Sequence, residues 1–189
     1  MIEVEIRGKL NKKSFEELKN YFQKEGEHIE SHNREMILLR GYPGYSENPN
    51  EREVDIRLRN TDGDCEIMVK RSSSNDNQTR KETSLPLEGN NLENAKEIAK
   101  AFGADSGLWM SRKKDIFMYE GIEFSLVQAP KDYYFYEAEY EVENEREARE
   151  AEKKLKQKAE ELDLKVMTPE QTKEFFYELD EEVNKDINL

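Results

Sequence analysis

Residues 1–10 read MIEVEIRGKL and show a strict strand pattern. Apolar and charged side chains alternate along it: Ile2, Val4 and Ile6 against Glu3, Glu5 and Arg7. Because successive side chains of a strand point to opposite faces, one face is apolar and the other carries two carboxylates and a guanidinium. In this segment alone, the charged face would be an ordinary solvated surface. The same arrangement recurs on strands far along the chain, and this recurrence decides the fold.

The composition indicates a folded chain with charged strand faces. Of the 189 residues, 39% are charged and only 35% are hydrophobic, which by itself would suggest disorder. The aromatic fraction of 10% and the clean alternating segments argue against disorder, because disordered chains lack both. A small barrel with a charged interior would also lower the apolar content without loss of the fold. We therefore expect a single domain over residues 1–189.

Charge and cysteine content restrict the partners and the compartment. The net charge of −13 makes general adhesion to nucleic acid or to an anionic membrane unfavourable. Cys65 is the only cysteine, which excludes an internal disulfide and favours a reducing compartment. Met1 leads directly into a charged strand, so no signal peptide is expected, and no apolar run is long enough to cross a membrane. We expect a cytoplasmic protein without a membrane or long nucleic-acid partner.

Further patterns predict strands interrupted by helices. Helices are expected over 11–25, 91–102, 144–162 and 168–183, and strands over 28–32, 35–40, 53–60, 65–71, 79–87, 107–119, 122–128 and 133–142. Ser14 is the expected N-cap of the first helix, and Thr168 that of the last. The pair Asp62-Gly63 predicts a tight hairpin, and the polar segment 72–77 predicts a loop.

Charged residues on the alternating strands form one set. Its members are Glu3, Glu5, Arg7, Arg57, Arg59, Lys70, Arg80, Glu82, Arg112, Lys114, Glu137 and Glu139. If their faces look outward, the chain is a solvated sheet suited to protein interactions. If they look inward, the sheet must close, because buried charges need water, counter-charges or a ligand. A closed barrel of about eight strands can hold one small ligand. Arg and Lys bind phosphate oxygens, and paired carboxylates bind Mg²⁺ together with phosphates, so a polyphosphate would be the complementary guest.

These residues also carry a family resemblance. Residues 3–7 (EVEIR) resemble the Glu-x-Glu-x-Lys opening of CYTH domains, also called triphosphate tunnel metalloenzymes. The resemblance continues in order through residues 55–59 (DIRLR), 66–70 (EIMVK), 80–82 (RKE), 112–114 (RKK) and 136–139 (YEAE), and covers the chain to about Asp180. It implies an α+β fold, namely an antiparallel closed β-barrel, or tunnel, of about eight strands with flanking helices. The C-terminal helices of residues 144–183 would pack on this barrel.

The resemblance also implies roles for the charged residues. Metal ligands for Mg²⁺ or Mn²⁺ would be Glu3, Glu5, Glu137 and Glu139. Substrate-binding residues would be Arg57, Arg59, Lys70, Arg80, Arg112 and Lys114. Catalytic residues would be Glu5, Arg7 and Lys70, and Glu82 matches an acidic position beside the basic strand.

Three positions depart from the family pattern. Arg7 stands where the family usually has Lys, and a guanidinium cannot act as a general base at ordinary pH. Val127 or Gln128 stands where an Asp is expected, and Ser84 replaces a second acidic residue. The phosphate-binding cations are therefore retained, while one metal-side carboxylate is missing.

The resemblance leaves three functions open. The first is a metal-dependent triphosphatase, a phosphoanhydride hydrolase acting on tripolyphosphate, thiamine triphosphate or a nucleoside triphosphate such as ATP. The second is a class IV adenylyl cyclase that forms cyclic AMP and pyrophosphate from ATP. The third is a non-catalytic module that binds polyphosphate or nucleotide. We expect an enzyme, as a monomer or homodimer, whose partner is a triphosphate-containing small molecule.

Overall fold

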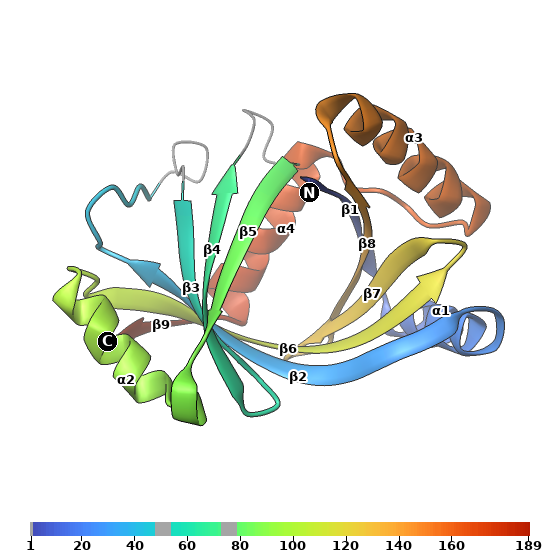
Figure 1. Cartoon of the computed structure of the whole chain (residues 1–189). Helices are drawn as coiled ribbons and strands as arrows, with labels where there is room; N and C mark the ends of the chain where they lie inside the picture. The colour runs from blue at the N-terminus through green and yellow to red at the C-terminus, as the bar shows by residue number, and fades with distance from the viewer. Residues whose placement is uncertain (1, 48–53, 73–78) are drawn as a thin grey trace. The chain divides into compact units, whose positions relative to one another are not determined.

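A computed structural model of the chain describes residues 2–47, 54–72 and 79–189, without the side chains of residues 72 and 79–81. Within these ranges the fold is α+β, with nine strands in an antiparallel sheet and four α-helices (Figure 1). The predicted class and the large antiparallel sheet are confirmed, and closure of the sheet into a barrel stays a prediction. No helix of the described ranges is long and apolar enough to cross a membrane.

The chain forms two compact units. Unit 1 contains residues 2–32 and 112–179, and unit 2 contains residues 33–111 and 180–189. Two strands, β2 (Glu27–Arg40) and β6 (Ser106–Tyr119), have residues in both units. The predicted single domain over residues 1–189 stays a prediction.

The strands of unit 1 pair in an antiparallel ladder. In this ladder β1 (Ile2–Leu10) pairs with β8 (Tyr133–Val142), β8 with β7 (Ile122–Ala129), and β7 with the second half of β6. The register places Glu5 opposite Glu139 and Arg7 opposite Glu137, so the charged faces of β1 and β8 coincide. The first and the last of the charged sequence motifs, at residues 3–7 and 136–139, thereby become neighbours.

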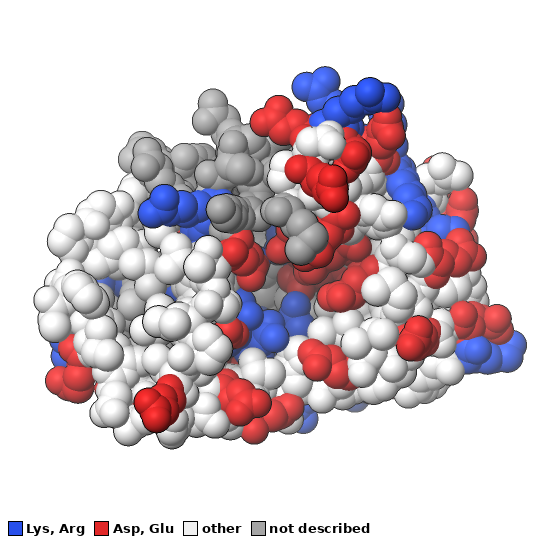
Figure 2. Space-filling view, in the orientation of Figure 1, with Lys and Arg blue, Asp and Glu red and all other residues white. Residues whose placement is uncertain are grey.

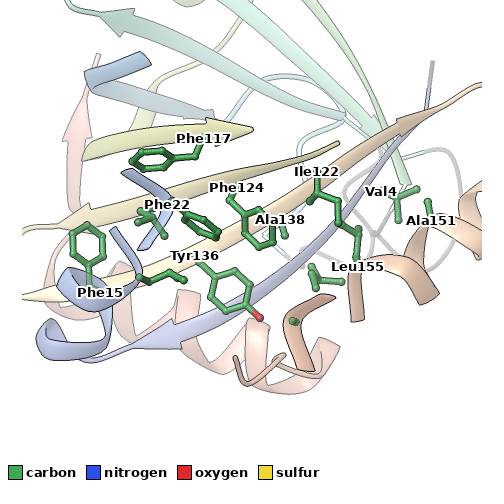
Figure 3. Packing of buried hydrophobic residues seen from close by; sticks show 14 of the residues in the cluster. Val4, Phe15, Phe22, Phe117, Ile122, Phe124, Tyr136, Ala138, Ala151 and Leu155 are labelled. Carbon is green, nitrogen blue, oxygen red and sulfur yellow. The ribbon is translucent and has the colours of Figure 1, made fainter. Parts of the chain in front are cut away.

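Helices cover the apolar face of this ladder. Both α1 (Lys12–Glu25) and α3 (Glu145–Glu161) pack against β1 and β8. Figure 3 shows the resulting core, which includes Val4, Phe15, Phe22, Phe124, Tyr136, Ala138 and Leu155. Gly8 is required where β1 crosses Tyr136, because an added Cβ would lie 2.3 Å from the tyrosine ring and 2.1 Å from the Lys165 carbonyl oxygen. Because the apolar face is buried, the charged side chains of β1 and β8 must lie on the opposite face.

Unit 2 has its own core. In this unit β3 (Val54–Thr61) pairs with β2 and with β4 (Asp64–Ser72), β4 pairs with β5 (Thr79–Pro86), and β9 (Lys185–Asn188) pairs with the first half of β6. A 3₁₀ turn (Glu88–Asn90) and α2 (Leu92–Ala101) follow, and α2 packs on β3 and β4. The buried core contains Ile37, Leu58, Ala95 and Ala99. The predicted hairpin is confirmed, since Asp62 and Gly63 both have positive φ.

The last helix, α4 (Pro169–Glu182), begins as predicted. The Thr168 hydroxyl accepts a hydrogen bond from the Gln171 N–H at 3.2 Å, and the Gln171 side-chain oxygen accepts one from the Thr168 N–H at 3.0 Å. In unit 1 the helix places Phe175 and Phe176 against Phe135 of β8, with ring centroids 5.5 and 5.9 Å away.

Some element boundaries were predicted wrongly. Asn11, not Ser14, is the N-cap of α1, because the Asn11 side chain accepts a hydrogen bond from the Ser14 N–H at 2.9 Å. A single strand, β2, replaces the predicted pair of strands around residues 33–34, and Asn33 there is held by hydrogen bonds to Asp62. The strand β9 was not predicted. Residues 73–77 of the predicted loop and residue 53 lie outside the described residues.

Candidate metal and anion sites

Three carboxylates converge on the charged face of β1 and β8 in unit 1. Glu3, Glu5 and Glu139 each place a carboxylate oxygen within 4.8 Å of the other two, and all three residues are half-buried. The alternation of β1 puts Glu3 and Glu5 on one face, and the register with β8 brings Glu139 opposite Glu5. Carboxylate oxygens are the ligands that Mg²⁺ and Mn²⁺ prefer, so the donor set fits the metal that the resemblance implies.

The protonation of Glu139 reflects this crowding. Burial, together with the negative charges of Glu5 and Glu137, raises the pKa of Glu139 to about 8. Like charges that lie close together disfavour further ionisation, and a divalent cation among them would reverse this effect. The cluster therefore has the electrostatic character of a cation site.

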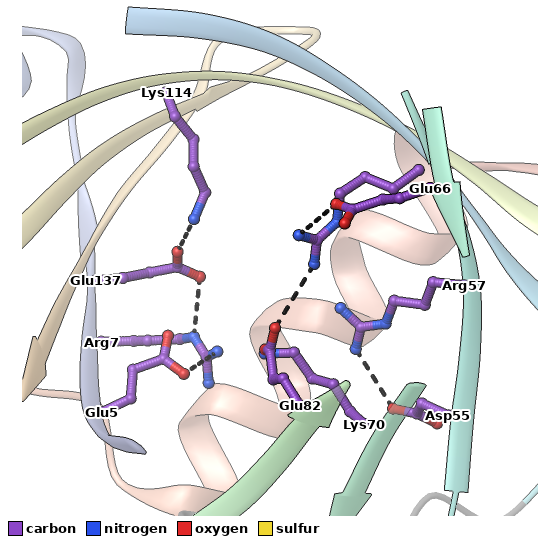
Figure 4. A network of polar contacts seen from close by, with 10 residues as sticks. Glu5, Arg7, Asp55, Arg57, Glu66, Lys70, Glu82, Lys114 and Glu137 are labelled. Carbon is purple, nitrogen blue, oxygen red and sulfur yellow. Dashed lines mark hydrogen bonds and ion pairs between the residues drawn. The ribbon is translucent and has the colours of Figure 1, made fainter. Parts of the chain in front are cut away.

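Glu137 is bound by cations and lies outside the three-carboxylate cluster. Arg7 Nε donates to one Glu137 oxygen at 3.2 Å, and Lys114 Nζ donates to the other at 2.5 Å (Figure 4). Burial alone would raise the pKa of Glu137, but Lys114 and Arg7 outweigh it and hold that pKa well below its usual range. The role of Glu137 as a metal ligand stays a prediction, and the structure places both of its oxygens on cations.

Arg7 is fixed from several sides. It forms ion pairs with Glu5 and Glu137, and its guanidinium carbon lies 5.4 Å from the centroid of the Phe176 ring. Burial would lower the pKa of Arg7, but the carboxylates of Glu5 and Glu137 raise it above its ordinary value. Arg7 is therefore a permanent cation that orients two carboxylates.

The strand β7 explains the missing carboxylate and adds one that sequence reasoning did not select. Val127 is fully buried and lies opposite Phe135, so this layer of the face is apolar. Glu123 lies on the charged face of the same strand, two residues before Ser125. It is paired opposite Glu139 of β8. Burial raises the pKa of Glu123, and the charges of Glu141, Glu3 and Glu30 add to this despite the opposing effect of Lys114. The alternation of Glu123 with the apolar residues of β7 is the signal that could have identified it.

Unit 2 carries a cationic face of its own. Arg57 and Arg59 of β3, Lys70 of β4 and Glu82 of β5 share one face, because Lys70 lies opposite Glu82 and Arg57 opposite Met68. Arg57 pairs with Asp55 at 3.3 Å (Figure 4). Arg59 pairs with Glu66 at 3.1 Å. Sequence reasoning did not select Asp55 and Glu66, which are the counter-ions.

Two donors on this face are unused. Among the described residues, the Nε atoms of Arg57 and Arg59 are buried and have no hydrogen-bond partner. Buried N–H groups without a partner are costly, and an anion would satisfy them. These two N–H groups could therefore donate hydrogen bonds to phosphate oxygens.

Three further predicted positions are placed less completely. Arg112 is buried on β6 in unit 1, on the same strand face as Lys114. The backbone of Arg80 lies in β5 opposite Ser72, and its side chain lies outside the description. Ser84, the position of the replaced acidic residue, lies opposite Met68. On the visible surface, acidic side chains are spread widely among smaller groups of basic ones (Figure 2).

Neither family models nor the sequences of curated proteins match the chain. Solved structures do match. The PH1819 protein from Pyrococcus horikoshii has a TM-score of 0.75 at 20% identity, over 93% of this chain and 98% of its own. A candidate adenylate cyclase from Vibrio parahaemolyticus has a TM-score of 0.69 at 17% identity, over 89% and 94%.

A third solved structure comes from Hippeastrum. It is a candidate adenylyl cyclase with a dominant triphosphatase activity, and it has a TM-score of 0.56 at 11% identity, over 87% of this chain and 89% of its own. At these identities the likeness concerns the fold. The chain therefore has the fold of the CYTH, or triphosphate tunnel metalloenzyme, proteins, as its ordered sequence motifs predict.

Proposed function

We propose that the chain is a divalent-metal-dependent enzyme that hydrolyses a phosphoanhydride bond of a small triphosphate. The observation that carries this proposal is the convergence of Glu3, Glu5 and Glu139 within 4.8 Å in a chain of this fold. The triphosphatase activity of the Hippeastrum protein supports it. Tripolyphosphate, thiamine triphosphate and nucleoside triphosphates are the substrate class, which the enzyme would meet in the cytoplasm.

Glu3, Glu5 and Glu139 would hold Mg²⁺ or Mn²⁺, and Glu137 would join them only after release from Arg7 and Lys114. When bound, the ion neutralises phosphate charge and acts as a Lewis acid for the attacking water. Arg7 keeps Glu5 and Glu137 oriented. Glu5 and Lys70 would act next to the reacting phosphate, as the resemblance implies.

The phosphate oxygens would be held by the basic residues Arg57, Arg59, Lys70, Arg80, Arg112 and Lys114. Phosphoryl transfer depends mostly on positioning and charge neutralisation, which such a set can supply. We propose that the sheet closes into the family's tunnel and that these cations and the metal ion act on one triphosphate. The unused Nε donors of Arg57 and Arg59 favour an anion as the ligand.

Two other functions keep specific support. The neighbour from Vibrio parahaemolyticus is a candidate adenylate cyclase, which favours a cyclase in which the ribose 3′-hydroxyl of ATP attacks and pyrophosphate leaves. The engagement of Arg7 by two carboxylates and the apolar Val127 favour a non-catalytic binder of polyphosphate or nucleotide.

The deciding experiment measures release of phosphate and pyrophosphate from tripolyphosphate, ATP and thiamine triphosphate, with Mg²⁺, with Mn²⁺ and with chelator. We expect metal-dependent release that is lost in Glu139→Gln. Glu141→Gln, an exposed change of equal charge on the same strand, is the control and should retain activity. Pyrophosphate formed together with cyclic AMP would identify a cyclase. Binding of tripolyphosphate without turnover in any condition would contradict the enzyme and leave the binding module.

A further inference from the structure

The cations on the charged face of unit 2 are matched by carboxylates. Figure 4 shows Arg57 joined to Asp55 by the ion pair given above. Arg59 is joined to Glu66 in the same way. Lys70 is joined to Glu82. These side chains are only 12–24% exposed, apart from that of Glu82, which is 30% exposed. The cations that would bind phosphate are thus already paired with internal anions.

Glu82 holds a special position among these anions, because it faces two cations. One of its oxygens contacts Lys70 Nζ, and the other lies 3.9 Å from Arg59 Nη2. Burial would raise the pKa of Glu82, but Lys70, Arg59 and Arg57 outweigh it and lower that pKa, so the side chain is charged at neutral pH. Asp55 lies beside Arg57 on the same strand, whereas Glu82 reaches the cations from the neighbouring strand β5.

We propose that Glu82 is an internal competitor of the ligand, occupying with its carboxylate the place on Lys70 and Arg59 that a phosphate group would take. This inference rests on the proposed function, because it concerns the same anion site. A carboxylate and a phosphate oxygen accept the same charge-assisted hydrogen bonds from Lys and Arg. Any polyphosphate that reaches these two cations therefore has to displace Glu82, and its affinity is reduced by the strength of the contacts that it breaks.

A competing role and a purely structural role of Glu82 predict opposite changes in the affinity for an anion. If Glu82 only supported the face, its replacement would weaken binding of an anion. If it competes, the isosteric change Glu82→Gln removes the competing charge and strengthens binding. Charge-assisted hydrogen bonds are strong enough that a gain of about tenfold or more is expected.

The test is calorimetric titration of the full chain with tripolyphosphate and with pyrophosphate, in chelator, so that metal binding plays no part. Glu82→Gln should bind both probes about tenfold or more tightly than wild type. The carboxylate of Glu66 pairs with Arg59, so Glu66→Gln should show a smaller gain. Glu88→Gln on the exposed 3₁₀ turn changes the net charge equally and should bind like wild type.

Equal or weaker binding by Glu82→Gln than by wild type would overturn the inference, and so would an equal gain in Glu88→Gln. Thermal melting checks that the variant is folded, and Glu82→Ser replaces it in the same titration if it is not. Turnover of tripolyphosphate with Mg²⁺ is measured in parallel. Wild-type turnover without tighter binding by Glu82→Gln rejects the competitor alone, whereas tighter binding without turnover rejects the proposed hydrolase and keeps the competitor.

Discussion

At the scale of single residues, Glu139 controls how the carboxylate cluster responds to pH. Its pKa is raised to about 8, so at neutral pH without metal the side chain is mostly protonated. A metal ion binds the ionised carboxylate and must displace this proton. We expect the apparent affinity for Mn²⁺ to rise with pH and to level off above about pH 8, with a slope of about tenfold per pH unit below it.

Titration of Mn²⁺ binding by electron paramagnetic resonance between about pH 6 and pH 9, a range of roughly three units, checks this expectation. Glu139→Gln should bind weakly and show a much flatter profile, while Glu141→Gln should retain the wild-type profile. A pH-independent affinity in the wild type would show that Glu139 does not exchange a proton for the metal.

The same residue makes a prediction about stability. The pKa of Glu139 is about 8 in the folded chain against an ordinary value of 4.5, so the unfolded state loses its proton at lower pH than the folded state. Between these values the unfolded state binds fewer protons, and the free energy of unfolding falls as pH rises. Glu139→Gln removes this loss, and we expect it to stabilise the metal-free chain at pH 8 by roughly 1–3 kcal/mol.

Urea unfolding in chelator at pH 5 and pH 8 measures this difference (about three pH units apart, which spans most of the shift). The gain should be larger at pH 8 than at pH 5, and Glu141→Gln should change little at either pH. A variant that is equally or less stable than wild type at pH 8 would mean that the carboxyl of Glu139 is not strained by its neighbours.

At the scale of elements, the start of α1 separates two cap assignments. The structure gives Asn11 as the N-cap, with its side chain accepting from the Ser14 N–H, whereas the capping-box pattern selected Ser14. Loss of an N-cap leaves a helix N–H without its acceptor. Asn11→Ala should therefore reduce the free energy of unfolding by about 1 kcal/mol, and Ser14→Ala by a few tenths at most. The opposite order in urea unfolding would restore the cap predicted from sequence.

The elements also show what the sequence could and could not predict. Alternation and turn residues were sufficient for β1, β8 and the hairpin of β3 and β4, because a half-buried strand shows its pattern locally. The break predicted at residues 33–34 was wrong because Asp62, distant in sequence, accepts hydrogen bonds from the backbone and side-chain N–H groups of Asn33. The strand β9 is four residues long and exists through pairing with β6, which a local pattern does not reveal.

The candidate sites follow the same rule. The motifs selected the charged residues, since each motif lies on one strand. Which carboxylate meets which cation depends on register between strands far apart in sequence, as when Arg7 and Lys114 both bind Glu137. Glu123 was missed because the register between β7 and β8, which places it next to the other carboxylates of the charged face, cannot be read from the sequence.

At the scale of the whole molecule, the continuity of β2 and β6 predicts cooperative unfolding. Each of these strands has residues in both units. If the strand ladder of one unit is lost, part of a strand that also belongs to the other unit becomes unpaired. We expect one unfolding transition for the chain, as the predicted single domain requires. Trp109, the only tryptophan, lies on β6 in unit 2 and reports that unit by fluorescence, while hydrogen exchange of β8 reports unit 1.

The two probes should give the same urea midpoint, and a change in one unit should be felt in the other. Asn11→Ala alters a helix cap in unit 1, so it should lower the Trp109 midpoint in unit 2 by the same amount as the midpoint for β8. Ser14→Ala, on the same helix, is the matched control and should shift both midpoints much less. If Asn11→Ala shifts the β8 transition and leaves Trp109 unchanged, the units unfold independently, and the chain is two domains that share two strands.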